Sequence, residues 1–224
     1  MPRQQQPARP ARRRSYDQFC ATARALDAVG DRWTLLIVRE LLAGPRRYTD
    51  LHADLPGVST DVLASRLKDM EQGGLAVRRR LPPPAAASVY ELTARGRGLL
   101  PVLTALAGWG APALGERRPT DALRAHWFAL PLLRSLEGLT EAGVVEVGLP
   151  EGTFHLRTGE EAEGRDVYGY GPAEDPDARL VLDEDAALDL ARGGCALAEL
   201  VRGGRARVHG EGALAAALRE TGRE

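Results

Sequence analysis

Apolar residues recur at helical spacing over residues 58–74. Leu63, Leu67 and Met70 stand at positions i, i+4 and i+7, which places them on one face of a helix. A hydroxyl group before the first turn accepts a free backbone N–H, and glycine permits the left-handed backbone that ends a helix. The stretch is therefore predicted to be one amphipathic helix, and the residues that supply these end signals are Ser59 or Thr60, then Gly73 and Gly74.

Three shorter apolar patterns precede this helix and predict further helices. The first covers residues 16–29, the second covers residues 32–43 and ends at a Gly-Pro pair, and the third covers residues 48–55. Proline ends a helix because it lacks the backbone N–H that the helix needs. A tight turn at residues 56–58 joins the third helix to the fourth, which is the order of a helix-turn-helix motif.

After residue 74 the apolar pattern changes to an alternation of period two. Residues 75–81 and 88–92 are predicted to be strands, because branched and aromatic residues alternate there with polar ones. The proline-rich residues 82–87 between them cannot continue a strand and are predicted to be a loop. Two strands joined by a loop, directly after a helix-turn-helix motif, predict a wing.

The polar face of residues 58–74 suits the major groove of DNA. Short hydroxyl side chains allow a close approach of the helix, and arginine binds phosphate or guanine. The solvated face of an ordinary surface helix has a similar composition, so this stretch by itself leaves both interpretations open. The candidate DNA-contacting residues of the helix are Ser59, Thr60, Asp61, Ser65, Arg66 and Lys68.

Arginines close to this helix favour the DNA-binding interpretation. Arg78, Arg79 and Arg80 lie in the predicted wing, where they can reach phosphates or a minor groove. Three consecutive arginines are also typical of a solvated surface, but in combination with the helix before them DNA contact is the favoured interpretation. Arg46 and Arg47, just before the third helix, are further candidate contacts.

Another helix is predicted over residues 99–109, and it is more apolar than a lone surface helix requires. Two interpretations stay open at this point. The helix packs against its own domain, or it forms a dimer interface together with the first helix. The candidate dimerisation residues are Tyr16, Phe19, Leu99, Leu103, Leu106 and Trp109.

Residues 119–224 show a different order of elements. A helix predicted over residues 121–138, kinked by Pro131, is followed by short strand patterns between glycine and proline turns, and then by helices. This order predicts an α+β fold with helices on one face of a sheet. The strands are expected at residues 144–147, 153–157, 166–170, 179–182 and 205–209, and the helices at residues 184–192, 196–202 and 212–220.

Charge divides the chain at the same place. Residues 1–118 contain 19 Lys and Arg against 11 Asp and Glu, a net charge of +8, whereas residues 119–224 contain 11 against 20, a net charge of −9. A basic half is expected of a protein that binds a polyanion, and an acidic half would be repelled by one. We expect a disordered basic arm (1–14), a winged-helix domain for DNA binding and dimerisation (15–118), and a second domain (119–224).

Four linked segments resemble the HxlR-type winged-helix regulators. They occur in the order and spacing of that family, namely residues 28–41, residues 44–51, Val62-Leu63 with Arg66-Leu67, and residues 90–96 with 99–103 and 109–110. The resemblance implies a bacterial, dimeric, DNA-binding protein. A two-fold symmetric dimer would need a pseudo-palindromic operator in double-stranded DNA.

Many members of this family carry a thiol near the first helix that senses electrophiles or oxidants, and Cys20 lies at about that place. The family's cysteine is often followed by proline, whereas Ala21 follows here. Because Cys20 lies beside Phe19 on the predicted apolar face, a buried and inert thiol is expected. A redox sensor is the alternative, and it requires an accessible thiol with a lowered pKa.

The C-terminal half resembles the sterol-carrier-protein-like domain that is appended to some regulators of this type. The matching segments are short, namely residues 175–178, Gly193 with Gly194, and residues 203–210. The resemblance implies an apolar pocket between helices and sheet, and therefore a hydrophobic small-molecule ligand. A domain filled by its own side chains, which serves only to hold the dimer, is the alternative.

Other chemistries find little support in the sequence. Four scattered histidines and two distant cysteines, Cys20 and Cys195, fit neither a structural zinc site nor a disulfide framework. The acids of residues 183–189 fall near the start of a predicted helix, where they interact favourably with its dipole. No nucleophile or phosphate-binding glycine motif is complete. We therefore expect no enzyme activity, no metal and no cofactor.

The sequence as a whole predicts a dimeric transcriptional regulator that binds double-stranded DNA. No run of 18 apolar residues occurs, and no apolar signal follows the first arginines, so we expect a cytoplasmic protein without membrane contact. The alternative function is sequestration of a small molecule, with a winged helix that serves mainly for dimerisation. The intact arginine wing argues against that alternative, since sequestration does not need it.

Overall fold

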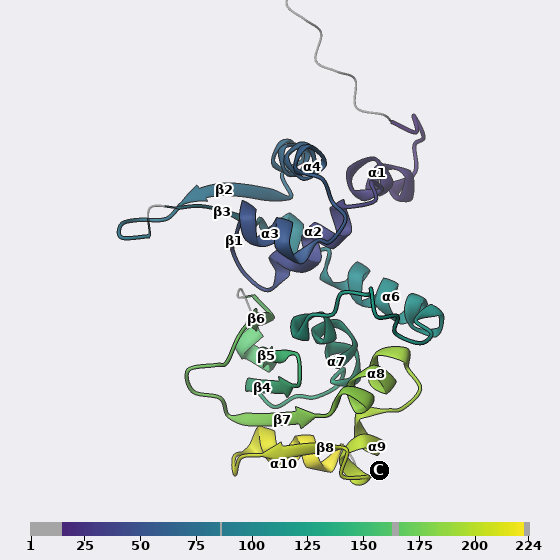
Figure 1. Ribbon diagram of the computed structural model, residues 1–224, viewed down its shortest axis with the longest axis vertical. Helices are drawn as coiled ribbons and strands as arrows, with labels where there is room; N and C mark the ends of the chain where they lie inside the picture. Colours follow the sequence, from purple (N-terminus) through teal and green to yellow (C-terminus); the bar gives the residue numbers. More distant parts are fainter. Residues whose placement is uncertain (1–14, 86, 163–165, 222–224) are drawn as a thin grey trace, which may run out of the picture.

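The computed structural model describes residues 15–85, 87–162 and 166–221, so the arm predicted at residues 1–14 lies outside the described residues. Figure 1 shows two halves, one above the other. The upper half carries the winged helix and ends just after α6 (Leu100–Gly110), and the lower half is built on a five-stranded sheet. The α+β fold predicted from the sequence is confirmed.

The upper half contains a helix-turn-helix motif followed by a wing. A small antiparallel sheet with the strand order β1-β3-β2 forms the wing. Its first strand was not predicted, because two residues are too short to show an alternation. The elements are α1 (Ala21–Val29), α2 (Thr34–Leu42), β1 (Arg46–Arg47), α3 (Tyr48–Asp54), α4 (Thr60–Gln72), β2 (Ala76–Arg80), β3 (Ser88–Leu92), α5 (Ala94–Arg97), α6 and the short turn η1 (Ala111–Ala113).

Helix α4 matches its prediction at both ends. The Ser59 hydroxyl accepts a hydrogen bond from the backbone N–H of Val62 at 3.3 Å, which caps the first turn. Gly74 adopts the left-handed backbone, with φ of +67°, just after the last turn. The predicted apolar stripe is fully buried in the core of the upper half, and its members are Leu63, Leu67 and Met70.

The lower half is a mixed sheet with helices packed against it. Its strand order is β6-β5-β4-β7-β8, in which β4 and β7 run parallel and the other neighbours run antiparallel. The edge strand β6 lies nearest to the upper half (Figure 1). The elements are η2 (Ala125–Phe128), α7 (Ala129–Ser135), β4 (Gly143–Leu149), β5 (Gly152–Thr158), η3 (Gly159–Ala162), β6 (Tyr168–Tyr170), β7 (Ala178–Leu182), α8 (Glu184–Arg192), α9 (Leu197–Arg202), β8 (Ala206–His209) and α10 (Ala213–Glu220).

The prediction for the first helix was wrong at its start. Helix α1 begins at Ala21, and the five residues before it, Tyr16 to Cys20, are not helical. The carboxylate of Asp27 accepts hydrogen bonds from the Ser15 hydroxyl at 3.0 Å and from the Tyr16 backbone N–H at 2.9 Å. These bonds fold the segment back along α1, and they compete with the helical hydrogen bonds that its apolar spacing favours.

The helix predicted over residues 121–138 was also too long. The helical part is limited to η2 and α7, and the backbone of Arg124 before them is extended. Arg124 donates to the carboxylate of Asp54 in α3 at 3.0 Å, so a contact far away in sequence holds this segment out of a helix. Pro131 does not kink α7, because it lies in the first turn, where its missing N–H has no helical partner to lose.

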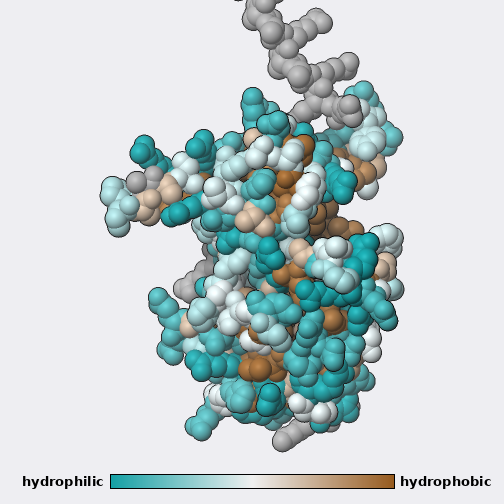
Figure 2. Space-filling view, viewed as in Figure 1, coloured by the Kyte–Doolittle hydropathy of each residue, from teal (hydrophilic) through white to brown (hydrophobic). Residues whose placement is uncertain are grey.

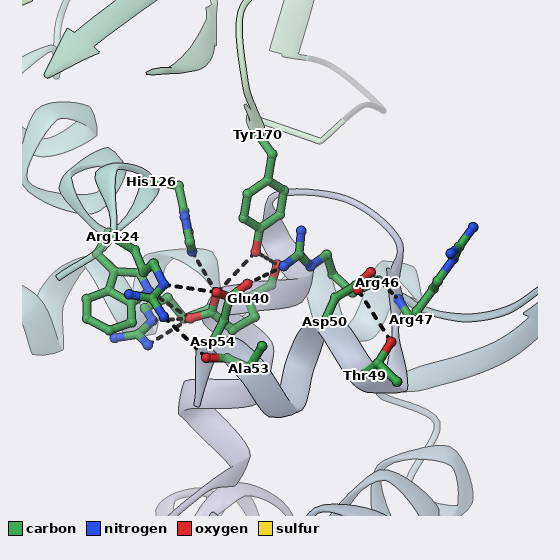
Figure 3. A network of polar contacts seen from close by, with 12 residues as sticks. Glu40, Arg46, Arg47, Thr49, Asp50, Ala53, Asp54, Arg124, His126 and Tyr170 are labelled. Carbon is green, nitrogen blue, oxygen red and sulfur yellow. Dashed lines mark hydrogen bonds and ion pairs between the residues drawn. The ribbon is translucent and has the colours of Figure 1, made fainter. Parts of the chain in front are cut away.

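A buried carboxylate joins the two halves. Glu40 of α2 has a fully buried side chain, and its Oε atoms bind donors from the lower half: His126 Nε2 at 2.6 Å, Trp127 Nε1 at 2.8 Å and the Tyr170 hydroxyl at 3.1 Å. Arg39 from the same helix adds an ion pair at 2.7 Å. Figure 3 shows Glu40 between His126 and Tyr170.

A second ionic contact lies beside the first. Asp54 pairs with both Arg46 and Arg124, and the Arg46 guanidinium lies over the ring of Tyr170 with its Cζ atom 4.0 Å from the ring centroid (Figure 3). The hydroxyl of Tyr168 donates to the backbone carbonyl of Arg39 at 2.7 Å. Edge strand β6 is therefore joined to α2 by side-chain hydrogen bonds.

The buried position of Glu40 affects its ionisation in two opposing ways. Burial alone would raise its pKa, but the hydrogen bond from His126 and the positive charge of Arg39 outweigh that effect and hold the pKa below its ordinary value. Glu40 is thus anionic at neutral pH. The interactions of the Glu40 carboxylate stabilise the junction fully at pH values above the ordinary pKa of glutamate, about 4.3. This stabilisation is lost as the pH falls through the lowered pKa of Glu40 in the folded protein.

We expect Glu40→Gln to lower the free energy of unfolding by about 3 kcal/mol at pH 7, because it leaves buried donors without an anionic acceptor. Urea unfolding measures this change, with the exposed Glu137→Gln as the matched control. The difference between Glu40→Gln and the unmodified protein should shrink as the pH falls below about 4.3. A difference that is absent at pH 7 would show that the junction does not depend on the charge.

Candidate nucleic-acid interface

The position of α4 is fixed by the turn before it. The Tyr48 hydroxyl, at the start of α3, donates to the backbone carbonyl of Thr60 at 2.7 Å, and the Val58 N–H donates to the Leu55 carbonyl at 3.2 Å. These bonds join the two helices of the motif directly. The role of Tyr48 was not apparent from the sequence, because a tyrosine at that spacing fits a core position equally well.

The polar face of α4 is open to solvent along most of its length. Arg66 is the exception, because its guanidinium pairs with Asp31 at 3.2 Å and with Asp69 at 2.8 Å, which leaves its side chain 26% exposed. To read a base, Arg66 would first have to leave these carboxylates. The predicted contacts that are exposed without this restraint are Ser59, Thr60, Asp61, Ser65 and Lys68.

The wing presents its arginines on two faces. In the antiparallel register Arg78 lies opposite Tyr90 and Arg80 opposite Ser88, so both project from one face of the ribbon. Arg79 projects from the other face, where its Nε atom pairs with Glu91 at 2.9 Å. Within the described part of the chain, Arg78 and Arg80 make no ion pair, and both are exposed. Figure 1 shows the wing extending away from the body beside α4.

The structure separates the two arginines of β1. Arg47 is exposed at the start of α3 and remains a candidate contact. Arg46 is only 19% exposed, because it is held between Asp54 and the ring of Tyr170 at the junction of the halves. This position favours a structural role for Arg46 rather than DNA contact. Adjacent residues in a strand point to opposite faces, so Arg46 faces the junction while Arg47 faces the solvent.

The predicted dimerisation residues also divide into two groups. Leu103 is 4% exposed and packs within its own chain. Leu106, 44% exposed, and Trp109, 83% exposed, form an open apolar stripe on α6 together with Val102. Tyr16 and Phe19 are exposed before α1, Leu99 is half-buried, and α1 and α6 lie on the same side of the molecule in Figure 1.

The expectation of a buried Cys20 was wrong. The residue occupies the cap position of α1, where the backbone is extended, and its side chain is exposed. The pKa of the thiol is lowered, because the backbone N–H groups of Ala23 and Thr22 in the first turn favour the thiolate. A thiol at the start of a helix meets unpaired N–H donors there, and these favour the thiolate.

The remaining candidate chemistry is structural. Asp183 accepts the Ala186 N–H at 2.7 Å and caps α8, and Asp189 pairs with Arg205 at 2.8 Å. Among the described residues, no group of three His, Cys, Asp or Glu side chains is arranged to hold a metal ion. In the same part of the chain, no helix is long and apolar enough to cross a membrane.

A helix fixed after a tight turn, with an exposed polar face and an arginine wing beside it, defines the class of winged helix-turn-helix transcriptional regulators. The family model of the HxlR-like helix-turn-helix matches residues 28–118. The chain belongs to this family. Its relatives are transcriptional regulators and not enzymes.

Two similar proteins come from Bacillus subtilis. An uncharacterised HTH-type transcriptional regulator, YvaP, is 37% identical over 86 residues, which are 38% of this chain and 80% of the relative. The HTH-type transcriptional regulator YodB is 34% identical over 85 residues, which are 38% of this chain and 76% of the relative. The structure of YodB in its reduced form is 30% identical in the aligned part, which is 46% of this chain and 100% of the YodB chain. The TM-score of this alignment is 0.39.

The two cysteines should differ in reactivity. The pKa of Cys20 is lowered, whereas the hydrogen bond from the Cys195 thiol to the Glu199 carboxylate raises the pKa of Cys195. We expect iodoacetamide to modify Cys20 faster than Cys195 at pH 7. The alkylation rate of Cys20 should also begin to rise at a lower pH than the alkylation rate of Cys195. Mass spectrometry of peptides from Cys20→Ser and Cys195→Ser variants measures each rate separately. Faster modification of Cys195 at pH 7 would contradict this expectation.

Proposed function

We propose that the protein is a homodimeric regulator that binds a pseudo-palindromic operator in double-stranded DNA. The observation that carries this proposal is the combination of an exposed polar face on α4 with two arginines on the adjacent wing, Arg78 and Arg80, that pair with no carboxylate of the described residues. In this proposal α4 of each subunit enters a major groove, and the wing reaches the neighbouring phosphates or minor groove.

The exposed side chains divide into two kinds of contact. Thr60 and Ser65 are short enough to let the helix approach base edges closely, and Arg66 adds a base contact if it leaves Asp31 and Asp69. Arg78 and Arg80 supply phosphate contacts, which position the protein without reading sequence. Arg79 joins them only at the cost of its pair with Glu91.

The second subunit is proposed to cover the exposed apolar stripe of α6 and the segment before α1. Val102, Leu106 and Trp109 follow each other at positions i, i+4 and i+7, and Phe19 is fully exposed in the single chain. Apolar side chains gathered on one side of a protein mark an interaction surface. A second copy is the occupant, as the family resemblance also implies.

We further propose that a small ligand of the lower half controls DNA binding. The matching family model ends at residue 118, so the resemblance of the lower half to a sterol-carrier-like domain stays a prediction. Support comes from the junction, where Glu40 of α2 binds three side chains of the lower half. A ligand that changes this junction would change the position of α2, and with it the DNA affinity.

Thiol sensing by Cys20 is a second candidate for regulation. The observation that favours it is an exposed thiol with a lowered pKa beside the proposed dimer surface. Alkylation or oxidation of Cys20 would add a group next to Phe19, and would alter how the two subunits meet.

Salt titration of DNA binding tests the wing. We expect Arg80→Ala to weaken binding to all sequences alike and to reduce the slope of log K against log salt by about one unit, since one phosphate contact is lost. The matched control is Arg207→Ala, an exposed arginine on β8 in the lower half. An unchanged slope in Arg80→Ala would remove the wing from the interface.

Trp109→Glu tests the dimer surface. We expect its dissociation constant for dimerisation to rise by about thirtyfold or more, because a charge would be buried in place of an aromatic anchor. Multi-angle light scattering over a range of concentrations measures the change. Val77→Glu places the same charge at an exposed apolar residue of the wing, 46% exposed, and should leave the dimer intact. Equal effects of the two variants would contradict the proposed surface.

A further inference from the structure

A cavity of about 690 Å³ lies between the two halves, within the size range of small-molecule sites. Elements of both halves surround it: α6 and the turn before α4 from the upper half, and η2, α7 and α8 from the lower half. Figure 2 shows hydrophobic residues between the polar surfaces of the two halves. The apolar wall is formed by Ala107, Leu123, Trp127, Phe128, Leu130 and Leu188.

Arginines are the main polar groups of this cavity. Arg134 of α7 is half-buried, and within the described residues no carboxylate lies at ion-pair distance from it. Among the described residues that line the cavity, one carboxylate is found, Asp121, and it is paired with Arg118. The other three lining arginines are paired with carboxylates: Arg39 with Glu40 at 2.7 Å, Arg117 with Glu184 at 2.6 Å and Arg192 with Asp189 at 3.7 Å.

Two glycines, Gly108 and Gly193, lie beside the guanidinium of Arg134. A Cβ atom at Gly108 of α6 would overlap the Nη1 atom of Arg134, so the glycine lets the guanidinium lie close against this helix in its present position. Its Nη2 atom lies near Gly193, at the end of α8, where the helix dipole places roughly half a negative charge. The partial charge at the end of α8 offsets only part of the positive charge of Arg134, so its planar guanidinium can still bind an anion.

We propose that this cavity binds a small apolar carboxylate, whose carboxylate group pairs with Arg134 and whose apolar body lies against Trp127, Phe128 and Leu188. A guanidinium binds a carboxylate through two parallel N–H···O bonds, which fixes the orientation of the ligand. A neutral apolar molecule would leave the charge of Arg134 unpaired in partly apolar surroundings, and it would therefore bind more weakly.

This site deepens the proposed ligand control, and it rests on that proposal for its effect on DNA. Thr104, Ala107, Gly108 and Ala111 of α6 and η1 line the cavity, while Val102, Leu106 and Trp109 lie on the opposite face of the helix. Pro56, in the turn before α4, also lines the cavity. The cavity therefore borders both the proposed dimer helix and the helix-turn-helix motif.

The test compares two probes of nearly equal shape, naphthalene-2-carboxylate and naphthalene-2-carboxamide, by isothermal titration calorimetry with the full chain at pH 7.5. We expect the carboxylate to bind about ten- to a hundredfold more tightly than the amide. Arg134→Gln should remove this preference by weakening carboxylate binding, without weakening binding of the amide. Arg207→Gln, on the surface of β8, is the matched control and should keep the preference.

A second variant tests the place of binding without changing charge. Ala191→Trp fills the cavity from α8 and should abolish binding of both probes. Equal affinities for the two probes, or a preference that survives in Arg134→Gln, would overturn the proposed site. If Arg134 serves only to stabilise the end of α8, Arg134→Gln lowers the melting temperature and leaves the preference in place, which also overturns the proposal.

DNA binding is measured in a separate experiment, so that a failure of the proposed carboxylate site can be told apart from a failure of the proposed regulator function. Saturating naphthalene-2-carboxylate should change the affinity of the unmodified protein for DNA fragments and leave that of Arg134→Gln unchanged. Carboxylate binding with unchanged DNA affinity would overturn the coupling between the cavity and α6. Intact DNA binding without carboxylate binding would overturn the site and leave the proposed regulator standing.

Discussion

Glu40 combines full burial with a negative charge, and its surroundings explain how both are possible. An isolated carboxylate in a protein interior would be strongly unfavourable, whereas Glu40 receives donors from His126, Trp127 and Tyr170 and a charge from Arg39. The donors come from two segments of the lower half that are more than 40 residues apart. The arrangement is therefore satisfied in one relative position of the halves, and a small shift would take the three lower-half donors away from a buried charge.

This constraint limits how the proposed ligand control could act on the winged-helix half. Helix α2, which carries Glu40, belongs to the core of the winged-helix half, and Arg39 beside Glu40 also lines the cavity between the halves. The cavity, the buried carboxylate and helix α6 thus share one junction. Because a satisfied ionic network tolerates few intermediate positions, a ligand there would favour one of a few discrete arrangements over gradual movement.

The sequence predicts well those features that depend on neighbouring residues. The apolar stripe, the cap and the glycine end of α4 are all local, and the structure confirms them. Asp183 at the start of α8 is another such local signal. Their physical basis, hydrogen bonding and side-chain periodicity within one element, is contained in a window of about a dozen residues.

Features that depend on distant partners were missed or misplaced. Asp27 binds the segment before α1 and shortens that helix, and Asp54 keeps Arg124 extended. Arg46 looked like Arg47 in the sequence, yet Tyr170, more than 100 residues away, holds it at the junction. Glu40 was not singled out at all, since nothing near it in sequence indicates that its partners lie in the other half.

The division of charge along the chain gains a structural meaning from this arrangement. Residues 119–224 carry a net charge of −9, which DNA would repel. Figure 1 shows α4 and the wing at one end of the molecule and strands β7 and β8 at the other. Repulsion between exposed charges is largely screened beyond about 8 Å at physiological salt. In the proposed function the acidic half would act on DNA binding through α2, α6 and the turn at Pro56, while its own charge stays far from the surface proposed to face DNA.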